Sequence, residues 1–167
     1  SGHFSNFELM AMQIEKSGVN LAAIYRPLNN IFLNILMERI RRKYICKNQI
    51  KKGAGGVRQL LKLYKKGYSI ALMIDQRVSE GIRSKLFNGD AFTTTIPAQF
   101  IKKFNCKVVP IYIERFNHVN FNIKIKKPIE FPKDSSTEKI TRDLNICLEK
   151  MILKDPGKWI WSHNRWK

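Results

Sequence analysis

The sequence has few cysteines, and their placement excludes two classes of small protein. Cys46, Cys106 and Cys147 are the only ones among 167 residues, and no two of them form a C-x-x-C pair. A structural zinc site or a disulfide framework needs closely spaced or paired cysteines. We therefore expect no metal site and no disulfides, and a reducing compartment suits the chain best.

Long apolar segments are also missing. No stretch approaches the roughly 20 apolar residues that a membrane-spanning helix needs, and no signal-peptide pattern opens the chain. The first residues are Ser1-Gly2-His3, without an initiator methionine. We expect the chain to be a fragment of a longer protein.

Acidic residues are scarce relative to basic ones. Lys and Arg number 31 against 13 Asp and Glu, which gives a formal net charge of +18. Such an excess favours polyanionic partners: nucleic acid, anionic lipid headgroups or an acidic carrier protein. The charge alone does not choose among these partners.

Hydrophobic periodicity predicts alternating helices and strands. The 44% of hydrophobic residues is enough for a packed core and excludes general disorder. Since no repeat or interdomain linker interrupts the pattern, the predicted fold class is α/β: a single-domain mixed sheet flanked by helices. Helices are expected from residue 7 to near Gly18 and over residues 28–43, 57–66, 96–104 and 137–153. Strands are expected over residues 21–25, 69–75, 107–114 and 121–126.

Two of these segments bear on ligand binding. The glycines at 53, 55 and 56 indicate a loop but not a phosphate-binding one, because no convincing strand leads into them and no G-K-[ST] follows. Residues 69–75 form a core strand in this prediction, with polar residues at its carboxyl end. Ligands of open α/β sheets bind at such ends.

The first eight residues carry the strongest sign of chemistry. His3 and Glu8 are separated by four residues at a predicted loop-to-helix junction. A carboxylate that meets one imidazole nitrogen fixes the tautomer and stabilises the imidazolium formed when the other nitrogen accepts a proton. We predict His3 as a general base and Glu8 as its orienting acid. By itself this spacing is weak, because it often occurs by chance.

Several further blocks follow in a fixed order. They are GHFSNFE at residues 2–8, IYRPLNN at 24–30, MIDQR at 73–77 with Glu80-Gly81, TTT at 93–95, VPIY at 109–112 and WIWSHNRW at 159–166. In this combination the sequence resembles the lipid A biosynthesis (lauroyl/myristoyl) acyltransferases, a branch of the lysophospholipid acyltransferase superfamily. Phe7 stands where that branch usually has Trp. The family's N-terminal membrane anchor would precede residue 1.

The resemblance implies a fold and an activity. It implies a glycerolipid acyltransferase-like domain over residues 1–167 that moves a fatty acyl chain from an acyl carrier protein thioester to a hydroxyl of a lipid A precursor. It also implies an anionic membrane surface as partner, at the cytoplasmic face of the bacterial inner membrane. The thioester is already activated, so no cofactor is expected.

Candidate substrate-binding residues follow from the same blocks. Arg26 suits an anionic group on the acceptor, or else braces the turn at Pro27. Asp75 orients Arg26, binds a sugar hydroxyl, or is only a strand-end turn residue. Thr93 to Thr95 place oxyanion donors or simply cap a helix. The complete predicted set is Asn6, Arg26, Asp75, Gln76, Arg77, Gly81, Thr94, Thr95 and Pro110.

The remaining histidines and the tryptophans have a lesser predicted part. His118 is expected in a loop, and His163 is not expected to be catalytic, because its neighbours do not match the base motif. Pro110 shapes the active-site wall in the family, or marks an edge strand. Trp159, Trp161 and Trp166 are interpreted as packing or interfacial aromatics.

Two alternative functions stay open at this point. One is acylation of a glycerophospholipid or another lipid by the same chemistry. The other is a basic nucleic-acid-binding module in which His3 and Glu8 are incidental. Such a module requires cations and exposed aromatic residues interleaved along one face. The cations here are spread along the chain instead, so no nucleic acid is expected as a partner.

Overall fold

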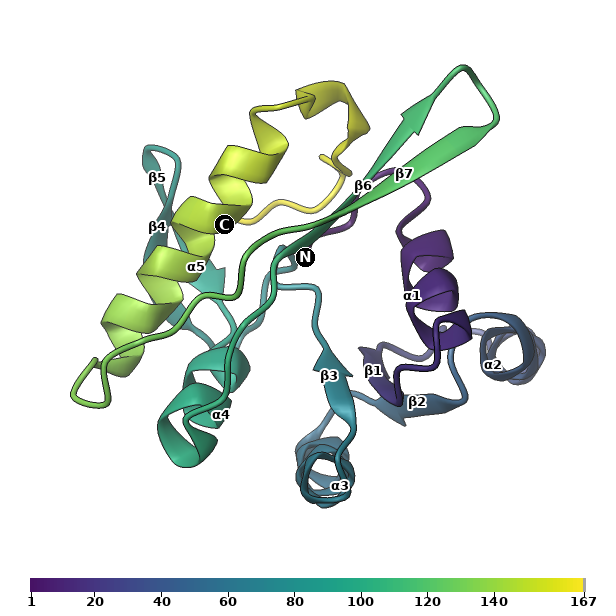
Figure 1. Cartoon of the computed structure of the whole chain (residues 1–167), viewed down its shortest axis with the longest axis horizontal. Coiled ribbons are helices and arrows are strands. Elements are labelled where there is room, and N and C mark those ends of the chain that lie inside the picture. Colours follow the sequence, from purple (N-terminus) through teal and green to yellow (C-terminus); the bar gives the residue numbers. More distant parts are fainter. Residues whose placement is uncertain (167) are drawn as a thin grey trace. The chain divides into compact units, whose positions relative to one another are not determined.

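The computed structural model describes residues 1–166 and, at Ala54, the backbone alone. Its contacts divide the chain into two compact units, and each is described by itself (Figure 1). One unit comprises residues 6–72. The other comprises residues 1–5 together with residues 73–166. Within the described residues, no helix has both the length and the apolar character that crossing a bilayer requires.

The unit of residues 6–72 contains a parallel sheet of three strands in the order β2-β1-β3. Ala22 of the central strand pairs with Asn48 on one side and Ile70 on the other. Parallel neighbours need crossover connections, and two helices supply them on opposite sides of the sheet (Figure 1). The elements are α1 Phe7–Lys16, β1 Leu21–Tyr25, α2 Ile31–Tyr44, β2 Asn48–Lys51, α3 Ala54–Lys65 and β3 Ser69–Ala71.

Local signals explain where these helices begin and end. The side chain of Asn30 accepts a hydrogen bond from Leu33 N at 3.1 Å and caps α2. After α1, Gly18 has a φ of 90°, a conformation that glycine adopts without steric cost. Leu21, Ala22 and Ile50 are buried in the centre of the unit.

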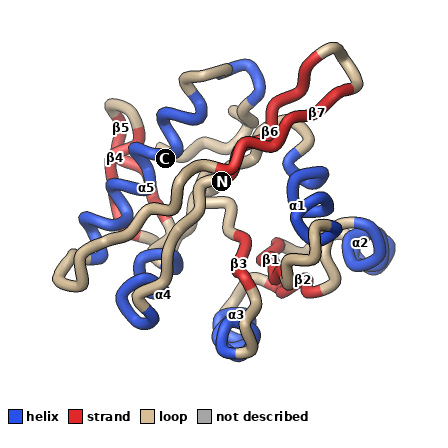
Figure 2. Tube along the Cα trace, viewed as in Figure 1, coloured by secondary structure: helices blue, strands red, loops and turns tan. Residues whose placement is uncertain are grey.

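The second unit is built from two antiparallel hairpins and two helices, visible in red and blue in Figure 2. Its elements are β4 Ile82–Leu86, β5 Gly89–Thr93, α4 Ile96–Phe104, β6 Ile111–Phe116, β7 Asn120–Ile125, α5 Thr137–Ile152 and the 3₁₀ turn η1 Pro156–Lys158. Ala98 and Ile101 of α4 pack against Ile140 and Leu144 of α5. This apolar cluster forms a core because both helices place small or branched residues at helical spacing.

The structure confirms the α/β class and most predicted elements, with corrections. Residues 69–75 were expected to be one strand, but only Ser69–Ala71 is extended in a sheet. The strand expected from residue 107 begins at Ile111, and Val108 makes an isolated bridge to Ile129. The strands fall into one parallel sheet and two hairpins. The single-domain organisation stays a prediction.

Three strands were not predicted from the sequence: β2, β4 and β5. Strand β2, residues Asn48–Lys51, leads directly into the glycines, and α3 begins at Ala54, so Gly55 and Gly56 lie in its first turn and not in a loop. The hairpin of β4 and β5 was not expected at all. Its two-residue turn holds Phe87 at a φ of 54°, which is uncommon for an aromatic residue.

Candidate active site

The backbone around His3 is fixed against the C-terminal segment of the chain. Phe4 is fully buried and forms a bridge with Trp159, while Ile160 N donates to the carbonyl of His3 at 3.0 Å. The Phe4 ring meets Tyr112 edge-on at 4.8 Å. His3 is therefore held by segments that are far away in the sequence.

The side chain of Asp75 is the centre of a hydrogen-bonded cluster. Its Oδ1 lies 2.7 Å from His3 Nδ1. Its Oδ2 accepts from the backbone N–H of His3 at 2.5 Å and from the indole Nε1–H of Trp159 at 2.9 Å. The carboxyl group is 3% exposed, whereas the imidazole is 17% exposed. The acid is thus enclosed while the imidazole stays within reach of a ligand.

Electrostatics keep Asp75 ionised in this enclosure. Burial raises the pKa of the Asp75 carboxyl group. Several contacts lower this pKa by more than burial raises it: the hydrogen bonds from the His3 side chain and backbone, the charge of His3, and the hydrogen bond from the Trp159 indole. The net pKa of Asp75 lies below its usual value. A carboxylate only accepts hydrogen bonds, so Nδ1 of His3 carries the proton between them and Nε2 is the nitrogen able to accept another.

Gln76 lies at that second nitrogen. Its Nε2 is 3.3 Å from Nε2 of His3, which is a long hydrogen bond. An acceptor hydroxyl that replaces this amide would meet the lone pair of His3 Nε2. The structure therefore brings three of the predicted residues together: His3, Asp75 and Gln76.

Arg165 fixes the chain on both sides of Asp75. Its NH1 donates to the carbonyls of Ile74 at 2.7 Å and Gln76 at 3.2 Å, and its NH2 donates to Thr93 Oγ1 at 2.9 Å. The guanidinium is fully buried, and burial lowers its pKa to about 10. Asn145 of α5 donates to the same Thr93 hydroxyl at 3.0 Å. The Asp75 backbone is thereby tied to the hairpin and to α5.

Gly2 allows the chain to approach the acid closely. A Cβ atom at this position would lie 2.9 Å from Leu148 Cδ1 and 3.1 Å from Asp75 Oδ2. Both distances are shorter than ordinary van der Waals contacts. A larger residue would push either the carboxylate or Leu148 aside.

Glu8 lies in the other unit, in the first turn of α1. Its carboxylate is 44% exposed and lies 3.7 Å from Nε of Arg41. Pairing between His3 and Glu8 stays a prediction. Arg26 is exposed just after β1, and Asn6 precedes α1 with a φ of 64°.

The other predicted substrate-binding residues lie in the same unit as His3. Arg77 stacks its guanidinium over Phe92 at 5.3 Å. Gly81 lies so close to the carbonyl of Thr93 that a Cβ would collide with it. Thr94 Oγ1 accepts from Ile96 N at 3.3 Å, Thr95 Oγ1 accepts from Gln99 at 3.0 Å, and the carbonyl of Pro110 accepts from Lys126 N at 2.9 Å. Their roles in binding stay predictions.

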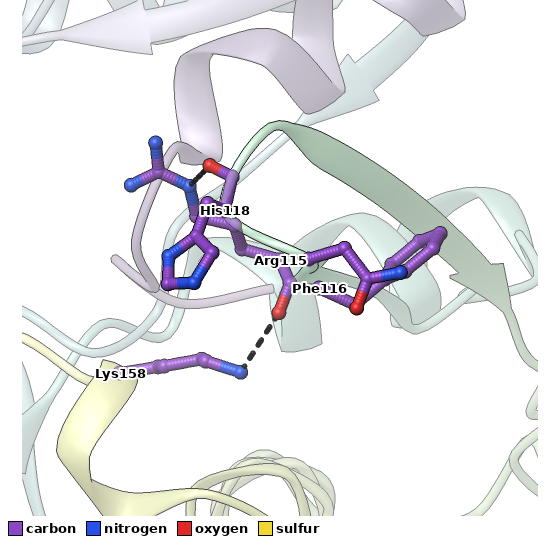
Figure 3. A pocket seen from close by; sticks show the side chains of 5 residues that line it. Arg115, Phe116, His118 and Lys158 are labelled. Atoms are coloured by element: carbon purple, nitrogen blue, oxygen red, sulfur yellow. Dashed lines mark hydrogen bonds between the residues drawn. The ribbon is translucent and has the colours of Figure 1, made fainter.

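The hairpin of β6 and β7 carries a separate hollow, lined by Arg115, Phe116, Asn117, His118 and Lys158 (Figure 3). Nε of Arg115 donates to the carbonyl of His118 at 2.7 Å, and Nζ of Lys158 donates to the carbonyl of Arg115 at 3.2 Å. Lys158 also pairs with Asp155 at 2.7 Å. These contacts stabilise the turn, and His118 is a turn residue as predicted.

Trp159 and Arg165 are parts of the site whose roles sequence reasoning missed. Both belong to the WIWSHNRW block, in which only the tryptophans were interpreted, as packing or interfacial aromatics. The indole N–H of Trp159 contacts the acid directly, and Arg165 contacts the backbone on either side of it. The available signal was the placement of an arginine among three tryptophans, since an arginine is seldom fully buried without partners.

Comparison with known proteins assigns the chain to a family. The model of the family described as bacterial lipid A biosynthesis acyltransferase matches residues 1–167. None of the curated proteins compared with the chain matches it. The match spans both units, including the His3 block and the Asp75 block. The chain therefore belongs to the bacterial lipid A biosynthesis acyltransferase family and is an acyltransferase.

Proposed function

We propose that the protein transfers a fatty acyl group from an acyl carrier protein thioester to a hydroxyl of a lipid A precursor, with His3 as general base and Asp75 as the residue that orients it. The observation that carries this proposal is the 2.7 Å contact between Asp75 Oδ1 and His3 Nδ1, in a chain whose family acylates lipid A.

The proposed reaction is a direct transfer with no acyl-enzyme. Nε2 of His3 takes the proton of the acceptor hydroxyl as its oxygen attacks the thioester carbonyl, and a tetrahedral oxyanion forms. The intermediate then collapses: the C–S bond breaks, and the imidazolium returns its proton to the departing thiolate. The products are an ester and a free carrier thiol. Asp75 stays ionised throughout and stabilises the imidazolium.

The charge of the chain supports the proposed partners. A net charge of +18 attracts an acidic carrier protein and an anionic lipid surface, and each Lys or Arg near such a surface contributes about 1 kcal/mol. Arg26, Gln76 and Arg77 remain the proposed contacts to the acceptor. We place the reaction at the cytoplasmic face of the inner membrane, where carrier-bound acyl chains and lipid A precursors meet.

The direct experiment is a transfer assay with the full-length protein, an acyl carrier protein thioester and a Kdo-bearing lipid A precursor. His3→Ala should lower kcat by about 10²–10⁴-fold, the usual contribution of a positioned base. His118→Ala is the matched control, because it removes another histidine from a turn without touching the proposed site. Its activity should equal that of the unmodified protein.

Three results, from this assay, from the same assay with a lysophospholipid acceptor, and from a nucleic-acid-binding measurement, would count against the proposal. Undiminished transfer by His3→Ala would remove His3 from its role. Transfer only to a lysophospholipid would keep the chemistry and replace the acceptor. Tight nucleic-acid binding with a steep dependence on salt and no transfer would replace the whole function.

A further inference from the structure

Helix α2 turns its apolar side chains outward. None of its 14 residues is buried, and five of its first six are large, exposed apolar residues, with Phe32 at 85% and Ile31 at 73% exposure. The set is Ile31, Phe32, Leu33, Ile35 and Leu36. Single exposed apolar residues are ordinary, but a continuous group marks an interaction surface.

The side of α2 that contacts the rest of its unit is polar apart from the half-buried Met37. Glu38 accepts from the hydroxyl of Tyr25 at 2.5 Å and pairs with Lys51 at 3.2 Å. Arg41 lies 3.7 Å from Glu8. Asn34 donates to Glu38 at 2.7 Å. A helix on the surface of a water-soluble protein has the reverse arrangement, with its apolar side inward.

The exposed face also changes character along the helix axis. The first two turns carry five exposed apolar residues and no charge. The last two carry the exposed cations Arg39, Arg42 and Lys43, together with Ile40 and Tyr44, which are 37% and 56% exposed. At 1.5 Å per residue the centres of the two groups are about 12 Å apart. The acidic residue of α2, Glu38, is already engaged, and its hydrogen bonds with Tyr25 and Asn34 hold its pKa at about 2.

We propose that α2 inserts its N-terminal half into an anionic membrane surface, at an angle to the membrane plane, while its C-terminal cations bind lipid phosphates. Interfacial helices bury their apolar side about 5–10 Å into the boundary between headgroups and acyl chains. Because α2 enters at an angle, its apolar group can reach that depth while the cations, about 12 Å away along the helix axis, stay at the level of the headgroups. A protein partner or a second copy would need acidic groups opposite Arg39, Arg42 and Lys43, whereas anionic headgroups supply them directly.

The expectation that a membrane is present comes from the proposed function, and this inference rests on it. The test of the inference does not measure acyl transfer. The full-length protein is sedimented with vesicles of phosphatidylglycerol and phosphatidylcholine in equal parts, and with phosphatidylcholine alone. The triple variant Ile31→Gln/Phe32→Gln/Leu36→Gln should bind the anionic vesicles at least tenfold more weakly, since three exposed apolar groups no longer enter the bilayer. The control is Val119→Gln/Leu153→Gln, which removes exposed apolar residues elsewhere.

The charge gradient needs a second pair of variants. Arg39→Gln/Arg42→Gln/Lys43→Gln should weaken binding to anionic vesicles and leave the weak binding to phosphatidylcholine unchanged. Lys133→Gln/Arg142→Gln/Lys150→Gln removes the same charge from the other unit and should have a much smaller effect. Circular dichroism and melting temperature establish that each variant is folded.

Insertion at an angle predicts a difference between the two ends of the helix. Phe32→Trp should add fluorescence that shifts to shorter wavelength on vesicle binding, and Tyr44→Trp should shift much less. Equal fluorescence shifts in the two variants would show that α2 does not enter the membrane at an angle.

Vesicle binding that is the same for the apolar triple variant and its control overturns the inference. So does a change of oligomeric state in that variant, because a second copy would then cover α2. A protein that binds vesicles as described but transfers no acyl group refutes the proposed function and leaves this inference standing.

Discussion

Asp75 and Glu8 are two carboxylates with very different surroundings. Asp75 is 3% exposed and receives hydrogen bonds from the His3 ring, the His3 backbone and the Trp159 indole. Glu8 is 44% exposed and has an ion pair at 3.7 Å with Arg41. The residue closer to His3 in the sequence is thus the less constrained of the two. A carboxylate can hold an imidazole in one orientation when it is buried and its own position is fixed by hydrogen-bond donors, as Asp75 is and Glu8 is not.

The largest effect that follows from this comparison concerns Asp75. Asp75→Asn keeps the size of the side chain but removes the charge that fixes the His3 tautomer and stabilises the imidazolium. We expect kcat to fall on the order of 10³-fold, with little change in KM. Steady-state kinetics measures it, and Asp143→Asn on the exposed side of α5 is the matched control. A fall in kcat of less than tenfold would contradict the role of Asp75 as the residue that orients His3.

Arg165 should have the next largest effect. Arg165→Lys keeps a charge, but an ammonium group cannot reproduce the planar set of bonds to Ile74, Gln76 and Thr93. We expect a loss of about 2–4 kcal/mol in the free energy of unfolding and a fall in kcat of about tenfold, because Asp75 is less firmly positioned.

Urea denaturation and kinetics together separate these two effects. Arg142→Lys, an exposed arginine on α5, should change neither quantity. If Arg165→Lys raised KM and left kcat unchanged, a positioning role for Arg165 would be ruled out.

A smaller effect is expected in the dependence of stability on pH. The pKa of Asp75 is lower in the folded protein than its value of about 3.9 in an unfolded chain. The carboxylate therefore stabilises the fold above about pH 4, and this contribution is lost as the pH falls through the folded pKa. As the pH is lowered below 4, the melting temperature should fall more steeply for the native protein than for Asp75→Asn. Parallel curves would mean that Asp75 is not ionised in the cluster.

Glu8 should give the smallest effect. A partly exposed ion pair such as Glu8–Arg41 contributes about 0–1 kcal/mol, so Glu8→Gln should hardly change stability. If Asp75 alone orients His3, kcat should change by less than about threefold. A loss comparable to that of Asp75→Asn would instead support the pairing of His3 with Glu8 that the sequence motif predicts.

The sequence was informative where local patterns decide the structure. β1 was predicted with its observed bounds, because five apolar or aromatic residues leave little alternative. α5 was predicted to within one residue from its regular apolar spacing, and in the structure the side chain of Ser136 caps it. Strand β2 was missed because Ile50 is its single apolar residue and its pairing with β1 is not local.

The site was only partly predictable for a related reason. His3, Asp75 and Gln76 were each singled out from blocks that resemble the family, but their contact joins residues 72 positions apart. No local period encodes such a contact. Arg165 is harder still, because a fully buried guanidinium contradicts the usual preference of arginine for the surface. Its three acceptors become visible only when the fold is known.

The hydrogen bond between His3 Nδ1 and Asp75 can be observed directly by proton NMR of the ¹⁵N-labelled imidazole. A strongly downfield Nδ1–H resonance should be present in the native protein and in Glu8→Gln, and absent from Asp75→Asn and His3→Ala. If that resonance persists in Asp75→Asn and disappears in Glu8→Gln, Asp75 is not the acid that orients His3.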